Sequence, residues 1–301
     1  MVAINRKFAF LINPVSGTGP KVEILRMIES ITRSKKNDFE SLHTNPEGHY
    51  PELEKKIQDK IITDIIVLGG DGSISQVTNA LRHTGVNFGI IPMGSGNGLA
   101  LAAGIPRDPK KAMEIIFRGY SSPVDAFYIN DHFSCMLSGI GFDGKVAHEF
   151  AESKKRGLVT YIKVAARNFF TAKPYPFHIT CPGHDIETEA FFVSIANSNQ
   201  FGNQFTIAPK ARLNDGLLDL VIVQKMNKFQ LMLAMLHQLR FGDVKEKIFR
   251  KKSILYFQAA GLNIKNPSLA PLHIDGDPAK TADQFSIRII PSAFRLLQPE
   301  H

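Results

Sequence analysis

The chain has 301 residues, of which 44% are hydrophobic and 21% are charged, with 23 Gly and 17 Pro. This length fits about two domains, and the composition excludes a disulfide-stapled miniprotein, a collagen-like repeat and a largely disordered chain. The 36 Lys and Arg residues exceed the 28 Asp and Glu residues, and the formal net charge of +8 favours an anionic partner such as a nucleotide, a nucleic acid or an acidic membrane.

The first third of the chain alternates short apolar runs with amphipathic stretches. The pattern predicts strands at 8–12, 65–68 and 88–92, and helices near 20–34, 73–82 and 109–118. Such alternation is typical of βαβ units around a parallel sheet. The run IIVL at 65–68 is apolar on both of its alternating faces, which is typical of a central strand covered by helices on each side.

Strands predominate after a linker at 119–124. They are predicted at 124–129, 132–137, 176–181, 190–196, 217–223, 253–259 and 285–290. Helical insertions are expected near 145–171 and near 227–241. The second part of the chain therefore reads as an antiparallel β domain.

Cysteine usage and hydropathy indicate the cellular compartment in which the protein is expected to fold. Cys135 and Cys181 lie far apart and form no CxxC or Cys/His cluster, so the sequence indicates neither a disulfide framework nor a zinc site. No apolar run approaches the roughly 20 residues that span a bilayer, and the first residues lack a signal-peptide core. We expect a cytoplasmic protein whose membrane contact is peripheral.

Three glycine-rich turns follow the predicted strands of the first third. They read NPVSGTG at 13–19, GGDGS at 69–73 and PMGSGNG at 92–98. Glycine lets the backbone approach a phosphate closely, and the free amides at a helix start attract negative charge. Because the carboxyl ends of neighbouring parallel strands line one crevice, the three turns together predict a polyanionic ligand such as a nucleotide.

Carboxylates accompany these turns. Asp71 would repel a bare phosphate, so its presence favours Mg²⁺ or a role as proton acceptor for a substrate hydroxyl. Asp125 and the motifs NDGLLD at 214–219 and DGD at 275–277 would add oxygen ligands for metal-assisted phosphoryl transfer, if the fold brings them together. Taken singly, each of the two motifs reads more readily as a turn.

Several nucleotide and hydrolase signatures are absent from the sequence. No segment matches GxxxxGK[ST] or GxSxG, and the turn at 94–98 lacks the third glycine of GxGxxG. A P-loop NTPase, a dinucleotide dehydrogenase and an α/β-hydrolase are therefore disfavoured.

The ordered set of motifs resembles the soluble diacylglycerol-kinase-type lipid kinases, a family that includes bacterial lipid kinases and the sphingosine and ceramide kinases. The matching segments are NPVSG at 13–17, GGDGS at 69–73, PMGSGN at 92–97, VD at 124–125, GIGFDGKV at 139–146, NDGLLD at 214–219 and DGD at 275–277. The resemblance covers nearly the whole chain, although GGDG alone is shared with NAD kinases and phosphofructokinase-like enzymes.

The resemblance implies an α/β plus β fold. An ATP-binding three-layer α/β domain would comprise residues 1–123 with about 290–301. An antiparallel β-sandwich-like, lipid-binding domain would comprise residues 124–289, with the active site in the cleft between the two domains.

The resemblance also implies site residues. ATP would be bound by Asn13, Pro14, Ser16, Gly17, Thr44, Gly69, Gly70, Gly72, Ser73, Ser75, Gly94, Ser95 and Asn97. Asp71 and Asp125 look like members of the family's acidic network linked to Mg²⁺. The family's structural Mg²⁺ site would map to the Asp215 carboxylate and to the carbonyls of Arg212 and Leu217.

Asp277 matches the position of the family's catalytic base, where Glu is usual. The shorter side chain withdraws the carboxylate by roughly 1.5 Å, and a misplacement of about 1 Å can cost on the order of 10²-fold in rate. The backbone must compensate, or activity is weak. The family's common Asn-Glu at the helix start is also replaced, here by Ser75 and Gln76.

Basic and aromatic residues mix at 150–171, as in a helix lying at a membrane interface. A helix packed on the β domain with a solvated basic face fits the segment equally well. The cluster KEKIFRKK at 245–252 could also approach an anionic bilayer, but such runs are more often simply solvated.

These observations predict an ATP- and Mg²⁺-dependent kinase that phosphorylates the hydroxyl of a lipid such as diacylglycerol. The alternatives are an NAD kinase-like enzyme and a catalytically weak regulator that binds nucleotide or lipid. The basic residues are dispersed and no recognition motif is evident, so a nucleic-acid partner is not expected. A homodimer is left open.

Overall fold

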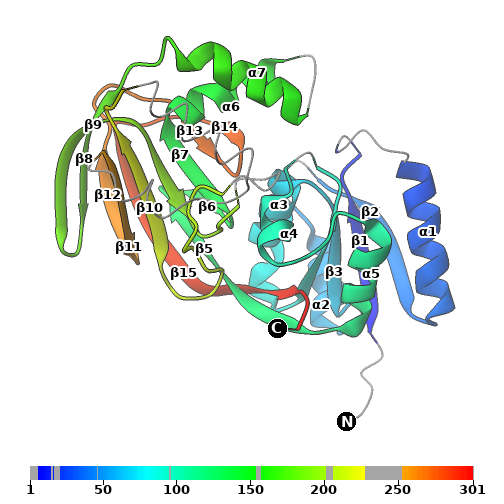
Figure 1. The fold of residues 1–301 in the computed structure, drawn as a ribbon. Helices are drawn as coiled ribbons and strands as arrows, with labels where there is room; N and C mark the ends of the chain where they lie inside the picture. The colour runs from blue at the N-terminus through cyan, green and yellow to red at the C-terminus, as the bar shows by residue number, and fades with distance from the viewer. Residues whose placement is uncertain are drawn as a thin grey trace. The chain divides into compact units, whose positions relative to one another are not determined.

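The computed structural model describes residues 6–14, 16, 21–45, 47–94, 96–153, 157–200, 206–227 and 253–300. The chain forms two compact units, Met1–Val124 with Ser292–His301, and Asp125–Pro291 (Figure 1). The sequence predicts domains at 1–123 with about 290–301 and at 124–289. The binding role assigned to each domain stays a prediction.

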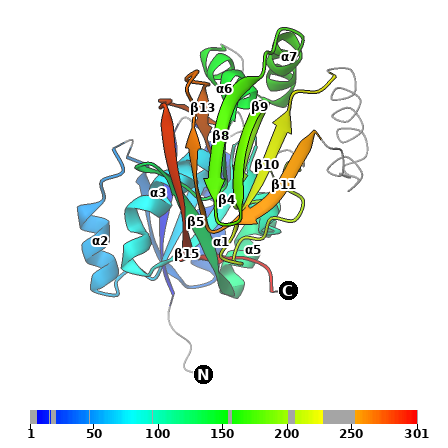
Figure 2. The ribbon, with the colours of Figure 1, turned by 90° about the vertical axis from the view of Figure 1, so that its left-hand side faces the viewer.

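The first unit is a parallel α/β fold, whose sheet has the strand order β4-β3-β1-β2 with all three pairings parallel. The strands are β1 (Lys7–Ile12), β2 (Asp38–His43), β3 (Asp64–Gly69) and β4 (Asn87–Pro92). The helices are α1 (Lys21–Ser34), α2 (Pro51–Gln58), α3 (Asp71–Leu81), the 3-10 helix η1 (Arg82–Thr84), α4 (Gly98–Ala102) and α5 (Pro109–Arg118). Figure 2 shows α2 and α3 on one side of these strands, and α1 and α5 on the other.

Burial explains the order of the strands. Every residue of β3 is buried, as the uniformly apolar run predicts for a central strand covered on both faces. Strand β2, at the edge of the sheet, is mostly exposed. Its sequence, DFESLH, therefore lacks the apolar run that marks the buried strands.

Capping residues account for the bounds of α5. The Asp108 carboxylate accepts hydrogen bonds from the amides of Lys110 and Lys111, and Pro109 occupies the first helical position. Gly119 follows the helix in the left-handed conformation, with φ of 76°. The sequence prediction of a helix at 109–118 is confirmed.

Within its described residues, the second unit is an antiparallel β structure with two helices. Its strands follow the order β14-β13-β7-β9-β8-β12-β15, and β10 pairs with both β9 and β11. The strands are β5 (Ser121–Ile129), β6 (His132–Ser134), β7 (Leu137–Gly141), β8 (Tyr175–Cys181), β9 (His184–Ala196), β10 (Leu218–Gln224), β11 (Ile254–Ala259), β12 (Gly261–Lys265), β13 (Leu272–Ile274), β14 (Asp277–Ala279) and β15 (Gln284–Leu297). Strand β5 begins in the first unit, and β15 ends there, where Arg295 and Leu296 pair in parallel with β4.

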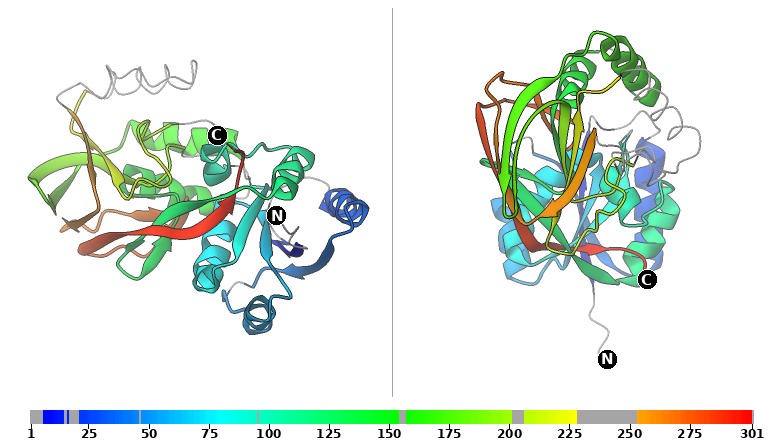
Figure 3. Two further views of the ribbon diagram at one scale, coloured as in Figure 1. Left: turned by 90° about the horizontal axis from the view of Figure 1, so that it is seen from below. Right: turned by 60° about the vertical axis from the view of Figure 1, so that its left-hand side comes forward.

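Among the described residues, two apolar clusters pack inside this unit. One is built from alternate residues of the strands, including Val193, Ile195 and Leu220. The other includes Phe169 and Val221. Helices α6 (Phe142–Glu152) and α7 (Leu158–Phe169) pack against each other, as Figures 1 and 3 show in green. The expected α/β plus β-sandwich-like fold is therefore confirmed.

Some elements differ from the sequence prediction. The single strand predicted at 132–137 is two strands, because the amides of Cys135, Met136 and Leu137 donate to the Asp275 carboxylate. The helix predicted near 145–171 is two helices. The helix predicted near 227–241 and the basic cluster at 245–252 lie outside the described residues, which stop at 227 and resume at 253.

Candidate functional site

The turns after β1, β3 and β4 contact one another in the first unit. The Asn13 side-chain amide donates to the Ser73 hydroxyl at 2.6 Å, which joins the first turn to the second. The Met93 amide donates to the Gly69 carbonyl at 2.9 Å, which joins the third turn to the second. The predicted convergence of the three turns is thus present at the carboxyl ends of neighbouring parallel strands.

Glycine is required where the second and third turns meet. A Cβ on Gly94 would lie 2.7 Å from the Gly70 Cα, and a Cβ on Gly70 would lie 3.2 Å from the Gly94 Cα. Asn97 closes the third turn from within: its Oδ1 accepts from the Gly94 amide at 2.9 Å, and its Nδ2 donates to the Gly94 carbonyl at 2.6 Å. Asn97 itself is buried and has a φ of 56°.

The Asp71 carboxylate connects the second turn to α4. One oxygen accepts from the Gly98 amide at 3.0 Å, and the other accepts from the Leu99 amide at 3.3 Å. These amides belong to the start of a helix, where a carboxylate is electrostatically favoured. Asp71 therefore orients the third turn, and its expected link to Mg²⁺ stays a prediction.

The other expected ATP residues lie on or beside the same turns. The Ser16 hydroxyl donates to the Asn13 carbonyl, and the Thr44 amide donates to the Ile12 carbonyl at the end of β1. Gly72 and Ser75 lie in α3, and Pro14 follows Asn13 directly. Gly17 and Ser95 lie outside the described residues.

Two contacts at these turns were not predicted. The Gln76 side-chain amide donates to the Asn45 carbonyl at 2.7 Å, which ties α3 to the segment after β2. An Arg107 guanidinium nitrogen donates to the Gly96 carbonyl at 3.1 Å. The sequence contains no local pattern for either contact.

Replacing Gly94 with Ala should separate the second and third turns. Overpacking of this kind costs about 1–3 kcal/mol, and we expect the apparent KM for ATP to rise on the order of tenfold. A matched control is Gly261→Ala, whose Cβ would lie 3.1 Å from the Ile287 carbonyl oxygen in the second unit. Steady-state kinetics checks the prediction, which is wrong if both variants raise the KM for ATP equally.

In the second unit, Asp125 anchors the NDGLLD turn. Its Oδ2 accepts from the Gly216 amide at 2.7 Å, and its own amide donates to the Leu213 carbonyl at 2.6 Å. Asp125 is 2% exposed. Its backbone carbonyl accepts from the Asn197 side chain at 2.7 Å, so this carboxylate is held on a rigid support.

The expected structural Mg²⁺ site lies on the turn that Asp125 holds. The exposed Asp215 carboxylate accepts from the Leu217 amide at 3.1 Å, and Gly216 has a φ of 74°. A carboxylate and backbone carbonyls are the hard oxygen ligands that Mg²⁺ prefers, so the donor types fit this ion. Among the described residues, no group of three or more His, Cys, Asp or Glu side chains could hold a metal ion.

Asp219, at the end of the same motif, is fully buried in β10. It accepts hydrogen bonds from the Tyr256 hydroxyl and from the Gln258 side chain. Burial raises the pKa of Asp219 above its usual value, and the two hydrogen bonds oppose this shift. Burial also raises the pKa of Tyr256, as does its bond to Asp219. These contacts hold β10 to β11 within the unit.

The DGD motif forms a two-residue hairpin between β13 and β14. Ile274 pairs with Asp277, while Asp275 and Gly276 have φ values of 50° and 88°, as an Asp-Gly hairpin turn requires. The buried Asp275 carboxylate accepts from the Ser134 hydroxyl at 2.7 Å and from neighbouring backbone amides. Asp277 is exposed.

A buried pair that the sequence reasoning did not assign lies next to this hairpin. His273 Nε2 is 3.4 Å from Asp143 Oδ2, and both side chains are almost fully buried. Asp143 belongs to the GIGFDGKV segment, which sequence reasoning used only as a family match. No local pattern singles out His273.

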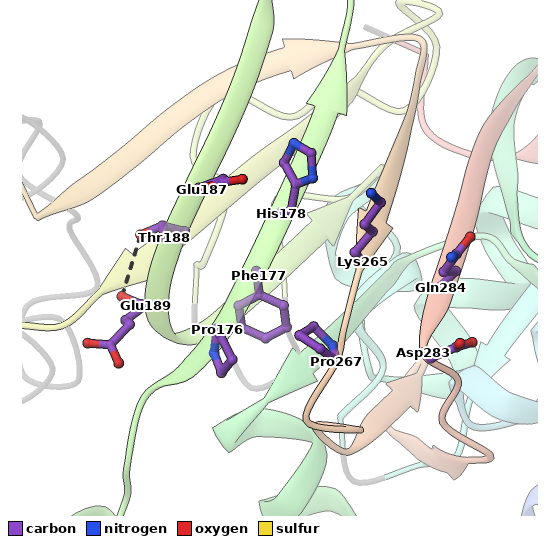
Figure 4. Close-up of a pocket in the computed structure, with 10 residues that line it drawn as sticks. All are labelled: Pro176, Phe177, His178, Glu187, Thr188, Glu189, Lys265, Pro267, Asp283 and Gln284. Atoms are coloured by element: carbon purple, nitrogen blue, oxygen red, sulfur yellow. Dashed lines mark hydrogen bonds between the residues drawn. The ribbon is translucent and has the colours of Figure 1, made fainter.

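A further pocket of about 710 Å³ lies on β8, β9, β12 and β15 (Figure 4). Charged side chains of both signs line it, including Lys265, Glu187 and Glu189. None of the predicted site residues belongs to its lining.

Comparisons with known proteins match both parts of the chain. The model of the diacylglycerol kinase catalytic domain matches residues 7–129, and the model of the YegS C-terminal NAD kinase beta sandwich-like domain matches residues 137–298. A crystal structure of a diacylglycerol kinase from Bacillus anthracis superimposes with a TM-score of 0.71 at 21% identity, covering 98% of this chain and 97% of that one. At this identity the superposition shows the fold.

Curated relatives agree with these models. "Probable lipid kinase YegS" from Salmonella arizonae is 30% identical over 246 residues, which is 79% of each chain. "Probable lipid kinase YegS-like" from Serratia proteamaculans is 26% identical over 296 residues, which is 95% of this chain and 92% of the relative. The chain therefore belongs to the YegS-like lipid kinase family, in which a diacylglycerol kinase catalytic domain is followed by a YegS C-terminal domain.

Proposed function

We propose that this protein transfers the γ-phosphoryl group of ATP to a hydroxyl group of a lipid such as diacylglycerol. The observation that carries the proposal is the joining of the three glycine-rich turns at the carboxyl ends of β1, β3 and β4. Kinases with the diacylglycerol kinase catalytic domain use ATP, and the family membership supports a lipid acceptor.

The proposed division of roles follows from what phosphoryl transfer requires. Positioning and charge neutralisation supply most of the catalysis, so the amides and side chains of the three turns would hold the phosphates. Asp71 would keep the third turn in place, and Asp277 would accept the proton of the lipid hydroxyl. The hydroxyl oxygen then bonds to the γ-phosphorus, the bond to the bridging oxygen breaks, and ADP leaves.

Magnesium has two proposed places in this scheme. Mg²⁺ bound with ATP would neutralise phosphate charge, and Asp71 and Asp125 are the carboxylates that we assign to its network. A structural Mg²⁺ would be held by the Asp215 carboxylate and the carbonyls of Arg212 and Leu217. The anchored turn and its donor types support the second assignment.

The deciding experiment incubates the purified chain with γ-labelled ATP, Mg²⁺ and a panel of acceptors. The panel contains diacylglycerol, a sphingoid base, ceramide, a polyprenol and, as a non-lipid, NAD. Label in one lipid supports the proposal and names the acceptor. Label in NADP alone would identify an NAD kinase-like enzyme, and tight ATP binding without any transfer would identify a regulator.

We also propose that α7 docks on an anionic membrane surface, where the lipid acceptor resides. One stripe of α7 is exposed at helical spacing, and it consists of Val159, Ile162, Lys163, Ala166, Arg167 and the following Phe170. Val159 is 67% exposed and Ile162 is 39% exposed, so the stripe presents apolar side chains beside its cations. Apolar side chains together with cations suit the headgroup region of an anionic bilayer.

The opposite face of α7 packs on the second unit. The Tyr161 ring contacts the Phe150 ring with centroids 5.5 Å apart, and Asn168 donates to Glu149 at 2.6 Å. Burial raises the pKa of Tyr161, with a further contribution from the Asp143 charge. The helix is thus fixed to the unit and presents its stripe outward. No helix within the described part of the chain has the length and apolarity to cross a bilayer.

The double variant Ile162→Ser with Phe170→Ser should bind vesicles rich in phosphatidylglycerol at least tenfold more weakly than wild type. Burial of such side chains is worth about 1.5–3 kcal/mol each when it is complete. Ile61→Ser is the matched control, because Ile61 is 47% exposed and lies in the other unit. Equal binding by the double variant and the control in a vesicle sedimentation assay would reject α7 as the docking surface.

A further inference from the structure

The buried pair Asp143 and His273 joins α6 to the hairpin that carries Asp277. His273 is 0% exposed in β13, and Asp143 is 6% exposed in the first turn of α6. Helix α6 contacts both strands of the hairpin, as Figure 1 shows. His148, five residues further along α6, also contacts the hairpin, with its Nε2 at 3.0 Å from the Leu272 carbonyl oxygen.

The pair fits into space that a glycine leaves open. Gly139 is the residue of β7 that pairs with His273, and a Cβ on it would lie 1.8 Å from Asp143 Oδ2 and 2.6 Å from His273 Nε2. A Cβ on Gly144 would lie 2.1 Å from the Pro271 carbonyl oxygen. Because interiors are closely packed, the imidazole and the carboxylate are held in a single arrangement.

The other imidazole nitrogen contacts the hairpin turn itself. The Gly276 amide lies 3.3 Å from His273 Nδ1 and donates to it. A neutral imidazole accepts at one nitrogen and donates at the other, so this contact assigns the proton to Nε2, which is the nitrogen facing Asp143. The turn is therefore held at Asp275 by its carboxylate contacts and at Gly276 by His273.

We propose that His273 is a positioning residue for phosphoryl transfer: its Nδ1 accepts from the Gly276 amide, the Asp143 carboxylate packs against the ring with Oδ2 3.4 Å from Nε2, and together they set the place of the Asp277 carboxylate. The inference rests on the proposed function, in which Asp277 accepts the lipid proton. Asp277 follows Gly276 directly in the chain, so a shift of the turn moves its carboxylate. A displacement of about 1 Å at a reacting group can cost on the order of 10²-fold in rate.

Two substitutions separate the roles of the two nitrogens. The Asn side-chain oxygen can take the place of Nδ1, so His273→Asn keeps an acceptor for the Gly276 amide. The Gln side-chain nitrogen can take the place of Nε2, so His273→Gln keeps a donor toward Asp143 but loses that acceptor. We expect His273→Gln to lower kcat at least tenfold with the KM for ATP within twofold of wild type, and His273→Asn to recover kcat to within threefold.

A third variant and a measurement on the unmodified chain complete the test. In the Asp277→Asn background, His273→Gln should lower kcat no further, because the residue that it positions is already disabled. Hydrogen exchange of the Gly276 amide in the wild-type protein should be slow. The inference is overturned by any one of three results. These are rapid exchange of the Gly276 amide, equal kcat losses in His273→Asn and His273→Gln, and a wild-type kcat in His273→Gln. If the wild-type chain labels no lipid, the proposed function fails. If the wild-type chain labels a lipid and His273→Gln labels it at the same rate, only the positioning role fails.

Discussion

Replacing Asp277 with Asn is expected to lower kcat for lipid phosphorylation by about 10²–10⁴-fold, the contribution typical of a general base. The amide cannot accept the hydroxyl proton, whereas the hairpin that carries it is held by other residues, chiefly by the Asp275 carboxylate. The KM for ATP and the thermal midpoint should stay near the wild-type values. Steady-state kinetics with labelled ATP and whichever lipid the acceptor panel labels measures the effect.

The conservative replacement and a control sharpen this prediction. Asp277→Glu keeps the carboxylate and lengthens its reach, so we expect kcat within tenfold of wild type. Asp283→Asn removes another exposed carboxylate of the same unit and should leave kcat unchanged. An Asp277→Asn variant that retains a third or more of wild-type kcat would show that the base lies elsewhere.

The second large effect is expected from Asp71→Asn, which should lower kcat/KM for ATP on the order of 10²-fold. The carboxylate accepts the Gly98 and Leu99 amides through separate oxygens, and Asn can replace only one of these acceptors. The nitrogen of the Asn amide then faces a donor, at a cost of about 1–3 kcal/mol. The third turn shifts relative to the second, and the phosphate site loses its alignment.

Asp108→Asn is the matched control for this variant. The Asp108 carboxylate also accepts two backbone amides at the start of a helix, but it lies at α5, outside the three turns. The control should leave the kinetics with ATP unchanged, because Asn caps helices about as well as Asp. A kcat/KM of Asp71→Asn within threefold of wild type would contradict the orienting role of Asp71.

The parallel sheet and its three turns could be predicted because their determinants are local. Strands β1, β3 and β4 are apolar almost throughout, since both faces of each strand are buried. The glycines of the turns stand directly after these runs. Edge strand β2 was missed because its exposure permits the polar sequence DFESLH, which carries no such pattern.

The second unit depends more on distant contacts. The break between β6 and β7 follows from the Asp275 carboxylate, which lies far along the chain from the amides that it accepts. Within 275-DGD-277, the residue types predict a tight turn, but they do not indicate that Asp275 is buried and Asp277 is exposed. That difference arises from the packing of the neighbouring segment 134–137 against the hairpin.

The sequence by itself determined the fold class, the order of the three glycine-rich turns and the family, because apolar runs, glycines and caps act within a few residues of one another. Only the tertiary structure decided that Asp71 bonds to α4, that Asp125 anchors the NDGLLD turn, and that His273 faces Asp143. These contacts join residues that are far apart in the chain, and such contacts exist only after the strands have paired and excluded water. Their residue types, Asp and His, are equally common in exposed turns, so no local pattern distinguishes the two situations.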